Sequence, residues 1–414
     1  MVFTSIGHLI NKELLKECHE EMDGDKATGI DGMSKEAYSR KLEGNLDSVV
    51  ERLKRKAYKP QPARVVEIRK ENGKTRPLSI YCYEDKLVQE ALRRVLEAVF
   101  EPHFYEEMMG FRPCRRCHNA IRKLNTMLEK NPTNYVLDAD IKGFFQNLDH
   151  EWAMKFIESR IKDPNITRLT RRVLKSGTMH ETEYEEAGGG AGQGNISSPI
   201  IANIYLHYVL LWWFKEKVQP GLKGYSGIVL YADDFVACFE YREEAEEFYR
   251  RLKHRMEYFG LDLEEEKSRL IEFGRNAVKG GTLDRKAETF DYLGFTHFCS
   301  QSRDGRFRVK RKTSRKKLTK KMKEVHMRIR EMRHKPIKEI IGKLNQILTG
   351  HYQYYGITDN IKSLTKMQHM VKKSLYEWLN RRSQRKSYTW EGFQEMLKVY
   401  PLSEPRIRVS VYAR

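Results

Sequence analysis

Long apolar segments are missing from this chain of 414 residues. Its longest apolar stretch, Tyr205 to Phe214, is too short to cross a bilayer. The N-terminus, MVFTSIGHLINKELLKE, also lacks the apolar core of a signal peptide. These absences indicate no membrane role, and we expect a cytoplasmic protein.

Cysteine is also scarce. Six cysteines, widely scattered, are too few for a disulfide scaffold in a chain of this length, and a reducing compartment fits them. Cys114 and Cys117 form a C-x-x-C followed by His118, but no second Cys or His pair stands at zinc-finger spacing. A structural zinc site is therefore not expected. The chain also lacks a Gly/Ser linker and internal repeats, and its length suits two or three packed subdomains.

Positive charge, by contrast, is abundant. Lys and Arg number 77 against 57 Asp and Glu, which gives a formal net charge of +20. Such an excess indicates a polyanionic partner, most often nucleic acid, although a protein can be basic without one. Eleven of the eighteen residues from Arg306 to Lys323 are Lys or Arg, which predicts an element that binds a nucleic-acid backbone.

Hydrophobic periodicity predicts an α+β core followed by a basic helical region after about residue 300. A β-hairpin is expected around Asn72-Gly73, the strongest short hairpin signal in the chain. The other predicted elements are helices within 12–57, interrupted by the ATGIDGM turn, and over 85–100, 149–162, 165–176, 198–217 and 241–259, with strands near 135–137, 268–272 and 290–298.

Two adjacent aspartates, Asp233 and Asp234, lie between apolar runs in IVLYADDFVACF. Both flanks favour strand, so a tight hairpin would carry the two carboxylates at its tip. Paired carboxylates attract a hard divalent cation. The alternative is a solvated Asp-Asp turn without a function.

A second acidic strand, in YVLDADIKGFF, favours the metal site. Asp138 and Asp140 would point to the same face of a strand because side chains alternate. If this strand is a neighbour of the hairpin, Asp140 and Asp233 can share two Mg²⁺ ions. Such a pair of ions clamps the attacking and leaving oxygens of a phosphoryl transfer. With the basic composition, this arrangement suggests a nucleotide polymerase.

The order of several motifs carries a family resemblance. They are ENGKTRPL, GFRP, ADIKGFF, GAGQGNISSP, YADD, DYLGF and LNQILTGHYQYYG. Together they resemble the reverse transcriptases encoded by bacterial group II introns, also called intron maturases, over about residues 10 to 410. The resemblance implies a right-hand polymerase, with fingers and palm in residues 1–300 and an α-helical thumb or maturase domain in residues 301–414.

The resemblance also implies the catalytic residues. Asp140 and Asp233 would bind two Mg²⁺ ions, for which Mn²⁺ could substitute, with help from the Ile141 carbonyl and with Asp234 as a weaker supporting acid. Lys267 would protonate the pyrophosphate leaving group, a role that needs a positioned donor. An exposed lysine without a function is the alternative.

The implied nucleotide contacts come from three segments. Lys70 and Arg76 would hold the triphosphate, whose oxygens suit a compact ammonium and a planar guanidinium; a solvated basic hairpin is the alternative. Phe145, five residues after Asp140, matches a gate that excludes a ribose 2′-OH, and simple core packing is the alternative. Gln193 would contact the incoming nucleotide and the template base.

The nucleic-acid contacts are expected from two further segments. Arg112 and Arg115 of the GFRP region would touch the template backbone. Within the basic run, the expected contacts are made by Arg311, Lys312, Arg315 and Lys316.

Two segments depart from the family pattern. Ala191 and Gly192 replace the usual threonine and proline, and Tyr81-Cys82-Tyr83 stands where a proline-containing stretch is usual. Each extra glycine in 188–194 raises the entropy cost of holding one loop shape, which predicts a loosely held loop.

The function implied is that of an RNA-directed DNA polymerase of group II intron type. It would extend a DNA or RNA primer on an RNA template and would also bind a structured intron RNA to assist splicing. Because no His-rich or Cys-paired segment follows the thumb in the printed sequence, we expect no endonuclease module there. The alternatives are a host-serving reverse transcriptase of defence or CRISPR-associated type, an RNA-binding splicing cofactor with a weakened polymerase, and an RNA-templated RNA polymerase.

Overall fold

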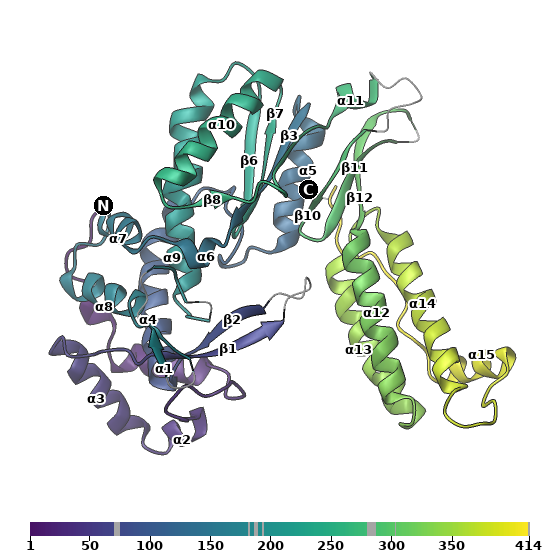
Figure 1. Ribbon diagram of the computed structural model, residues 1–414, viewed down its shortest axis with the longest axis horizontal. Coiled ribbons are helices and arrows are strands. Elements are labelled where there is room, and N and C mark those ends of the chain that lie inside the picture. The colour runs from purple at the N-terminus through teal and green to yellow at the C-terminus, as the bar shows by residue number, and fades with distance from the viewer. Residues whose placement is uncertain are drawn as a thin grey trace.

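The computed structural model describes residues 1–69, 75–180, 183–185, 189–192, 194–279, 287–302 and 304–412. Its elements form a mixed α+β arrangement that begins with an N-terminal helical region and ends with a bundle of long helices (Figure 1). Among the described residues, no helix combines the length and the apolar character needed to span a bilayer.

The N-terminal region contains three helices and a β-hairpin. The helices are α1 (Lys12–Glu21), α2 (Lys35–Ser39) and α3 (Leu42–Lys54). The first two begin at side-chain caps, Asn11 and Ser34, which accept hydrogen bonds from the Leu14 and Ala37 amides. The predicted break between helices is confirmed.

The predicted hairpin is confirmed as β1 (Ala63–Arg69) paired antiparallel with β2 (Thr75–Ile80), in the register Arg69 opposite Thr75. Its Asn72-Gly73 turn lies outside the described residues. Two short strands, β4 (Thr178–His180) and β5 (Glu183–Glu185), extend this sheet in the order β2-β1-β4-β5.

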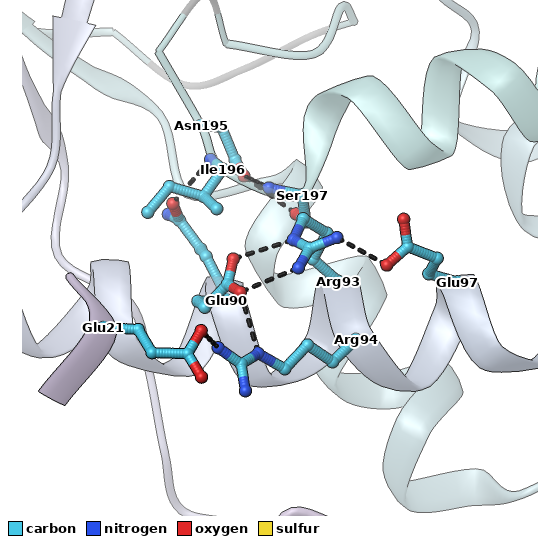
Figure 2. Close-up of polar contacts among 9 residues, drawn as sticks. Glu21, Glu90, Arg93, Arg94, Glu97, Asn195, Ile196 and Ser197 are labelled. Carbon is cyan, nitrogen blue, oxygen red and sulfur yellow. Dashed lines mark hydrogen bonds and ion pairs between the residues drawn. The ribbon is translucent and has the colours of Figure 1, made fainter. Parts of the chain in front are cut away.

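Helix α4 (Tyr83–Phe100) joins the N-terminal region to the middle of the chain. Arg94 pairs with Glu90 of its own helix and with Glu21 of α1, and Arg93 pairs with Glu90 and Glu97 (Figure 2). The Arg94–Glu21 pair connects α1 to α4, and buried residues of both helices belong to one apolar core.

The central sheet has the order β6-β7-β3-β8, and β9 also pairs with β3. Its strands are β3 (Tyr135–Lys142), β6 (Ser226–Tyr231), β7 (Asp234–Phe239), β8 (Asp262–Leu263) and β9 (Arg269–Glu272). Strands β6 and β7 are buried on both faces. Leu137 and Phe235 join the large core with α9 and α10, and Val136 and Val236 join a second core with α5.

The helices around this sheet agree with the predicted segments for α7 (His150–Glu158), α8 (Pro164–Leu174), α9 (Ser198–Leu206) and α10 (Arg242–Tyr258). The sequence did not predict α5 (Cys117–Lys130), α6 (Phe144–Asn147) and α11 (Arg275–Lys279). The predicted helix over 198–217 begins as α9 and continues through two π-helical segments, His207–Trp212 and Phe214–Val218.

A third sheet lies beyond the central one, in the order β10-β11-β12. The single strand predicted near 290–298 is in fact two, β10 (Thr289–Tyr292) and β11 (Phe295–Gln301), which turn at Leu293-Gly294, where both residues have positive φ. Strand β12 (Phe307–Thr313) follows, so the first part of the basic run is strand rather than helix. Strand β11 pairs antiparallel with β12 along the whole length of β12.

The C-terminal region is helical, as predicted. It consists of α12 (Arg315–Met332), α13 (Ile337–Tyr355), α14 (Ile361–Leu379) and α15 (Trp390–Val399). These helices enclose an apolar core of their own, which starts at Leu318 and includes Leu344, Leu375 and Phe393. Trp378 and Tyr376 pack against this core.

Candidate active site

The YADD hairpin has a two-residue turn. Tyr231, the last residue of β6, lies opposite Asp234, the first of β7, and Ala232 adopts a positive φ of 56° between them. The turn therefore carries Asp233, as the sequence predicts. Strands β3 and β7 are neighbours, and Asp140 lies directly opposite Asp234. The condition on which the metal site depends, that the two acidic strands are adjacent, is met.

A third acid shares this face of the sheet. Asp138 lies two residues before Asp140 and opposite Val236, so the alternation of side chains turns it to the same side. Burial, together with the neighbouring carboxylates of Asp138, Asp140 and Asp233, raises the pKa of Asp234 to about 8. Burial likewise raises the pKa of Asp138 to about 7, with opposition from Arg269.

Lys267 supplies a cation to this cluster. Its Nζ lies 2.7 Å from Asp140 Oδ2 and 3.8 Å from Glu264 Oε2. The hydrogen bond to Asp140 raises the pKa of the lysine, so the side chain is a cation at neutral pH. The Glu264 amide donates to the Asp140 carbonyl over 2.8 Å, which ties this loop to β3. Lys267, the expected general acid, is thus hydrogen-bonded to Asp140, the carboxylate expected to bind metal.

The donor set fits a hard divalent cation. It consists of carboxylate oxygens with the Ile141 backbone beside them in β3, and Mg²⁺ prefers oxygen ligands. Within the described ranges, no three His, Cys, Asp or Glu side chains are already grouped as a metal cage. Mg²⁺ does not require one, because it usually takes one or two protein carboxylates and completes its shell with water and substrate phosphates.

Phe145 stands on the short helix α6, which follows Gly143 with its positive φ of 55°. Phe144 is buried, whereas Phe145 is only partly buried. The ring of Phe111, 49% exposed, meets the Phe145 ring edge-on with 6.3 Å between centroids. Partial exposure distinguishes Phe145 from an ordinary core residue, although it also packs against the core.

The GFRP segment runs beside the YADD hairpin. The Met109 amide donates to the Leu230 carbonyl over 2.8 Å, and the Leu230 amide donates to Glu107 over 2.9 Å. Asn203 Nδ2 of α9 donates to the Gly110 carbonyl over 2.9 Å. A Cβ at Gly110 would lie 2.3 Å from the Ala232 amide nitrogen, so only glycine allows this approach to the turn.

The expectation for Arg112 needs correction, because its side chain points inward. Its guanidinium pairs with Glu101 at 2.9 Å and donates to the Tyr105 and Met108 carbonyls over 2.7 and 2.9 Å. These contacts occupy the N–H donors of the Arg112 guanidinium that a template phosphate would need. Arg115 is half-buried, and to the described part of the chain it makes only long contacts, 3.4 Å to the Glu106 carbonyl and 3.8 Å to the Met109 sulfur, so it remains a candidate for the template backbone.

Arg311 also needs correction. It lies on β12, where Val309, Arg311 and Thr313 alternate inward, and it is fully buried. Its Nη2 donates to Asn125 Oδ1 and to the Val309 carbonyl, each over 2.6 Å. From sequence alone, a run of basic residues would be expected to face solvent throughout. In a strand, however, side chains alternate between two faces, so every second residue of the run points into the core.

Lys312, Arg315 and Lys316 are exposed and line one cavity of about 890 Å³. Arg269, Lys320 and Lys323 also line it, and Asp291 and Glu324 are its acidic members. Arg269 pairs in register with Asp138, so this basic cavity borders the acidic cluster. Asp138 and Arg269 were not among the predicted site residues; the shared face of Asp138 and Asp140 was the signal for the first.

The nucleotide-contacting residues are only partly described. Lys70 and Gln193 lie outside the described residues. Arg76 has its backbone in β2 opposite Ile68, and its side chain is not described. The expected roles of these three residues stay predictions.

Comparisons with known proteins cover most of the chain. Residues 68–297 match the family described as reverse transcriptase (RNA-dependent DNA polymerase). Residues 315–395 match the group II intron, maturase-specific domain. The first match includes both acidic strands, and the second includes most of the C-terminal helices.

Individual relatives agree with these matches. The group II intron-encoded protein LtrA of Lactococcus lactis is 30% identical over 300 residues, which are 72% of this chain and 48% of the relative. Protein YkfC of Escherichia coli is 31% identical over 241 residues, 51% of this chain and 63% of the relative. A 91 kDa protein in the cob intron of Schizosaccharomyces pombe is 39% identical over 184 residues, 44% of this chain and 22% of the relative. The chain thus spans about half the length of LtrA.

The inward position of Arg112 predicts a stability effect. Arg112→Ala leaves Glu101 and two carbonyls unpaired, so we expect a loss of about 3 kcal/mol in the free energy of unfolding, measured in urea. Arg115→Ala is the matched control, with an expected loss below about 0.5 kcal/mol. Unchanged stability together with weaker template binding in Arg112→Ala would restore the original assignment.

Proposed function

This chain belongs to the family of group II intron reverse transcriptases and maturases, and we propose that it copies an RNA template into DNA by extending a primer with dNTPs. One observation carries the proposal: Asp140 and Asp234 face each other across β3 and β7, with Asp233 in the adjoining turn. A protein that only binds RNA gains nothing from repelling carboxylates beside a basic cavity, whereas a metal-dependent polymerase needs them.

We propose a right-hand arrangement for this activity. The fingers would comprise the N-terminal helices and the sheet of β1 and β2, the palm the central sheet, and the thumb helices α12 to α15 (Figure 1). The division proposed from the sequence, residues 1–300 and 301–414, is supported by the separate apolar core that begins at Leu318. The basic cavity would receive the phosphates of the template and primer.

In the proposed mechanism, Asp140 and Asp233 would hold two Mg²⁺ ions, with the Ile141 carbonyl and Asp234 in support. When bound, such ions supply positive charge to the attacking and leaving oxygens of the phosphoryl transfer. Lys70 and Arg76 orient the dNTP triphosphate. Lys267 Nζ lies 2.7 Å from Asp140 Oδ2. During the reaction it would leave this carboxylate, bind the pyrophosphate leaving group and donate a proton to the pyrophosphate.

Primer extension on a generic RNA template tests the polymerase. Asp233→Asn and Asp140→Asn keep the shape of each side chain but remove its charge, so we expect each to lower kcat by about 10³-fold or more. Chelation of Mg²⁺ should abolish product formation, and added Mg²⁺ or Mn²⁺ should restore it. Asp304→Asn, a charge loss in an exposed loop, should leave the rate unchanged.

RNA binding and primer extension by the unsubstituted protein distinguish a polymerase from a splicing cofactor. If it binds RNA but makes no product with dNTPs, the polymerase proposal fails. If Asp233→Asn makes as much product as the unsubstituted protein, the proposed metal-ion mechanism is wrong.

We propose that Phe145 selects the sugar and that Gln193 contacts the incoming nucleotide. Support for the gate comes from its partly exposed ring, which the exposed Phe111 ring meets edge-on. A bulky ring at this point would overlap a ribose 2′-OH and leave a deoxyribose unhindered.

Phe145→Val should therefore relax sugar selection. We expect kcat/KM for an rNTP to rise by about tenfold or more relative to the matching dNTP, because a clash of about 1.4 kcal/mol is removed. Phe144→Val, a loss of the neighbouring buried ring, is the matched control and should not change the ratio. An unchanged ratio in Phe145→Val would favour core packing and would keep open an RNA-templated RNA polymerase.

A maturase role is supported by the second family match and by the charge of the α14–α15 loop. Arg381, Arg385 and Lys386 are exposed there. Arg382 Nη2 donates to the Lys335 carbonyl over 3.3 Å, which ties this loop to the α12–α13 turn. We infer that this loop contacts the phosphates of a structured intron RNA.

The double variant Arg385→Ala/Lys386→Ala tests the loop. Loss of two phosphate contacts should weaken binding to the intron RNA that flanks the coding sequence and lower the slope of log K against log salt by about 1 to 2. Primer extension on a generic template should persist. Lys362→Ala/Lys366→Ala removes the same charge from the exposed surface of α14. Equal effects of both pairs would indicate a net-charge effect and overturn the assignment.

A further inference from the structure

The segment before α9 is held firmly on its α6–α7 side. The Ala191 amide donates to the Phe145 carbonyl over 2.7 Å, and the Gly190 amide donates to the Leu148 carbonyl over 2.8 Å. His150 Nε2 bonds the Gly190 carbonyl at 2.6 Å. The loop is thus attached to the backbone of the residue proposed as the sugar gate.

The same loop also contacts the segment that follows β2. Tyr81 is only 2% exposed. Burial raises the pKa of its hydroxyl, and the side chains of Asn195, Ser176 and Ser79 oppose this rise. A Cβ added at Gly192 would lie 2.1 Å from Tyr81 Oη and 3.3 Å from Cζ. The hydroxyl therefore occupies the space that any side chain at 192 would need.

Two more contacts tighten this junction. A Cβ at Gly194 would lie 2.1 Å from the Ser79 carbonyl oxygen, and its φ of 121° also favours glycine. Gln89 Oε1 of α4 accepts the Ile196 amide over 3.1 Å, and Asn195 Oδ1 accepts the Ser197 amide over 2.8 Å (Figure 2). Both described neighbours of position 193 are therefore packed directly against the β2 segment. The expectation of a loosely held loop is wrong for these residues, because the glycines permit close packing.

We propose that Tyr81 is a positioning residue that, seated against Gly192, sets the distance between β2 and the loop attached to Phe145. This inference rests on the proposed polymerase function and adds a residue to it. The two departures from the family pattern, at 81 and at 192, then form one feature, since the tyrosine hydroxyl and the missing side chain fill the same space. Nucleotide affinity and sugar selection depend on this distance.

A purely structural role for Tyr81 makes different predictions. If Tyr81 only fills the core, its removal lowers stability and lowers all kinetic constants through the folded fraction. A positioning role changes KM for the nucleotide more than kcat. A direct contact with Gly192 also makes the effects of substitutions at the two positions interdependent.

A double-mutant cycle in primer extension tests the contact. Tyr81→Phe removes the hydroxyl that fills the space beside Gly192, so we expect KM for dNTP to rise about 3- to 10-fold with kcat within about twofold. Gly192→Ala places its Cβ on the hydroxyl, and we expect kcat/KM to fall more than about tenfold. The double variant Tyr81→Phe/Gly192→Ala should recover to within about threefold of Tyr81→Phe, since the nearest atom is then Cζ at 3.3 Å.

Tyr83→Phe is the matched control, because it removes another buried hydroxyl from the same segment, one that bonds His19 over 2.8 Å. It should leave KM for dNTP unchanged. Thermal unfolding of each variant shows whether it is folded at the assay temperature. The rNTP-to-dNTP ratio is measured on the same samples and should rise in Gly192→Ala.

The outcomes separate this inference from the polymerase proposal. An active parent with an unimpaired Gly192→Ala, or with a double variant no better than Gly192→Ala, overturns the Tyr81 contact and leaves the polymerase intact. A parent that makes no product overturns both. Recovery in the double variant supports the contact, because independent losses of stability would add rather than cancel.

Discussion

The repulsion among the carboxylates of β3 and β7 is the constraint on which the rest of the structure depends. Asp140 and Asp234 lie directly opposite each other, a pairing that destabilises a sheet when both are charged. The sheet forms nonetheless because most other positions of both strands are buried, with Leu137 and Phe235 in one core and Val136 in the other. Asp233 lies in the turn and Asp234 begins β7, and Asp140 lies opposite Asp234.

Positive charge is distributed to match that repulsion. Lys267 contacts Asp140, Arg269 lies opposite Asp138, and the cavity bordered by Arg269 is lined mainly by lysines and arginines. A basic surface beside an acidic cluster can hold the phosphates of a nucleic acid near a metal ion while the acids hold the metal. Arg112 and Arg311 have a different role, because both side chains are buried. The Arg112 guanidinium bonds Glu101 and two carbonyls, and Arg311 Nη2 donates to Asn125 and the Val309 carbonyl.

The loop before α9 connects regions that are distant in sequence. It is bonded to the Phe145 and Leu148 carbonyls on one side and packed on Ser79 and Tyr81 on the other. Such close backbone approach is possible only where side chains are absent, so the glycines that raise the entropy cost of ordering the loop also allow it to be held. A displacement of β2 would therefore be transmitted to the helix that carries Phe145.

The sequence by itself determined the local elements, because hydrophobic periodicity, the Asn-Gly turn and the Asp pair act over a few residues. It also predicted, through the family resemblance, that Asp140 and the YADD turn would meet. Tertiary structure alone decided which arginines are buried, because the carbonyls that bind Arg112 and the Asn125 side chain that binds Arg311 are placed by distant packing. It also decided that Tyr81 and Gly192 share one space: their contact joins residues 111 positions apart, and no local pattern records it.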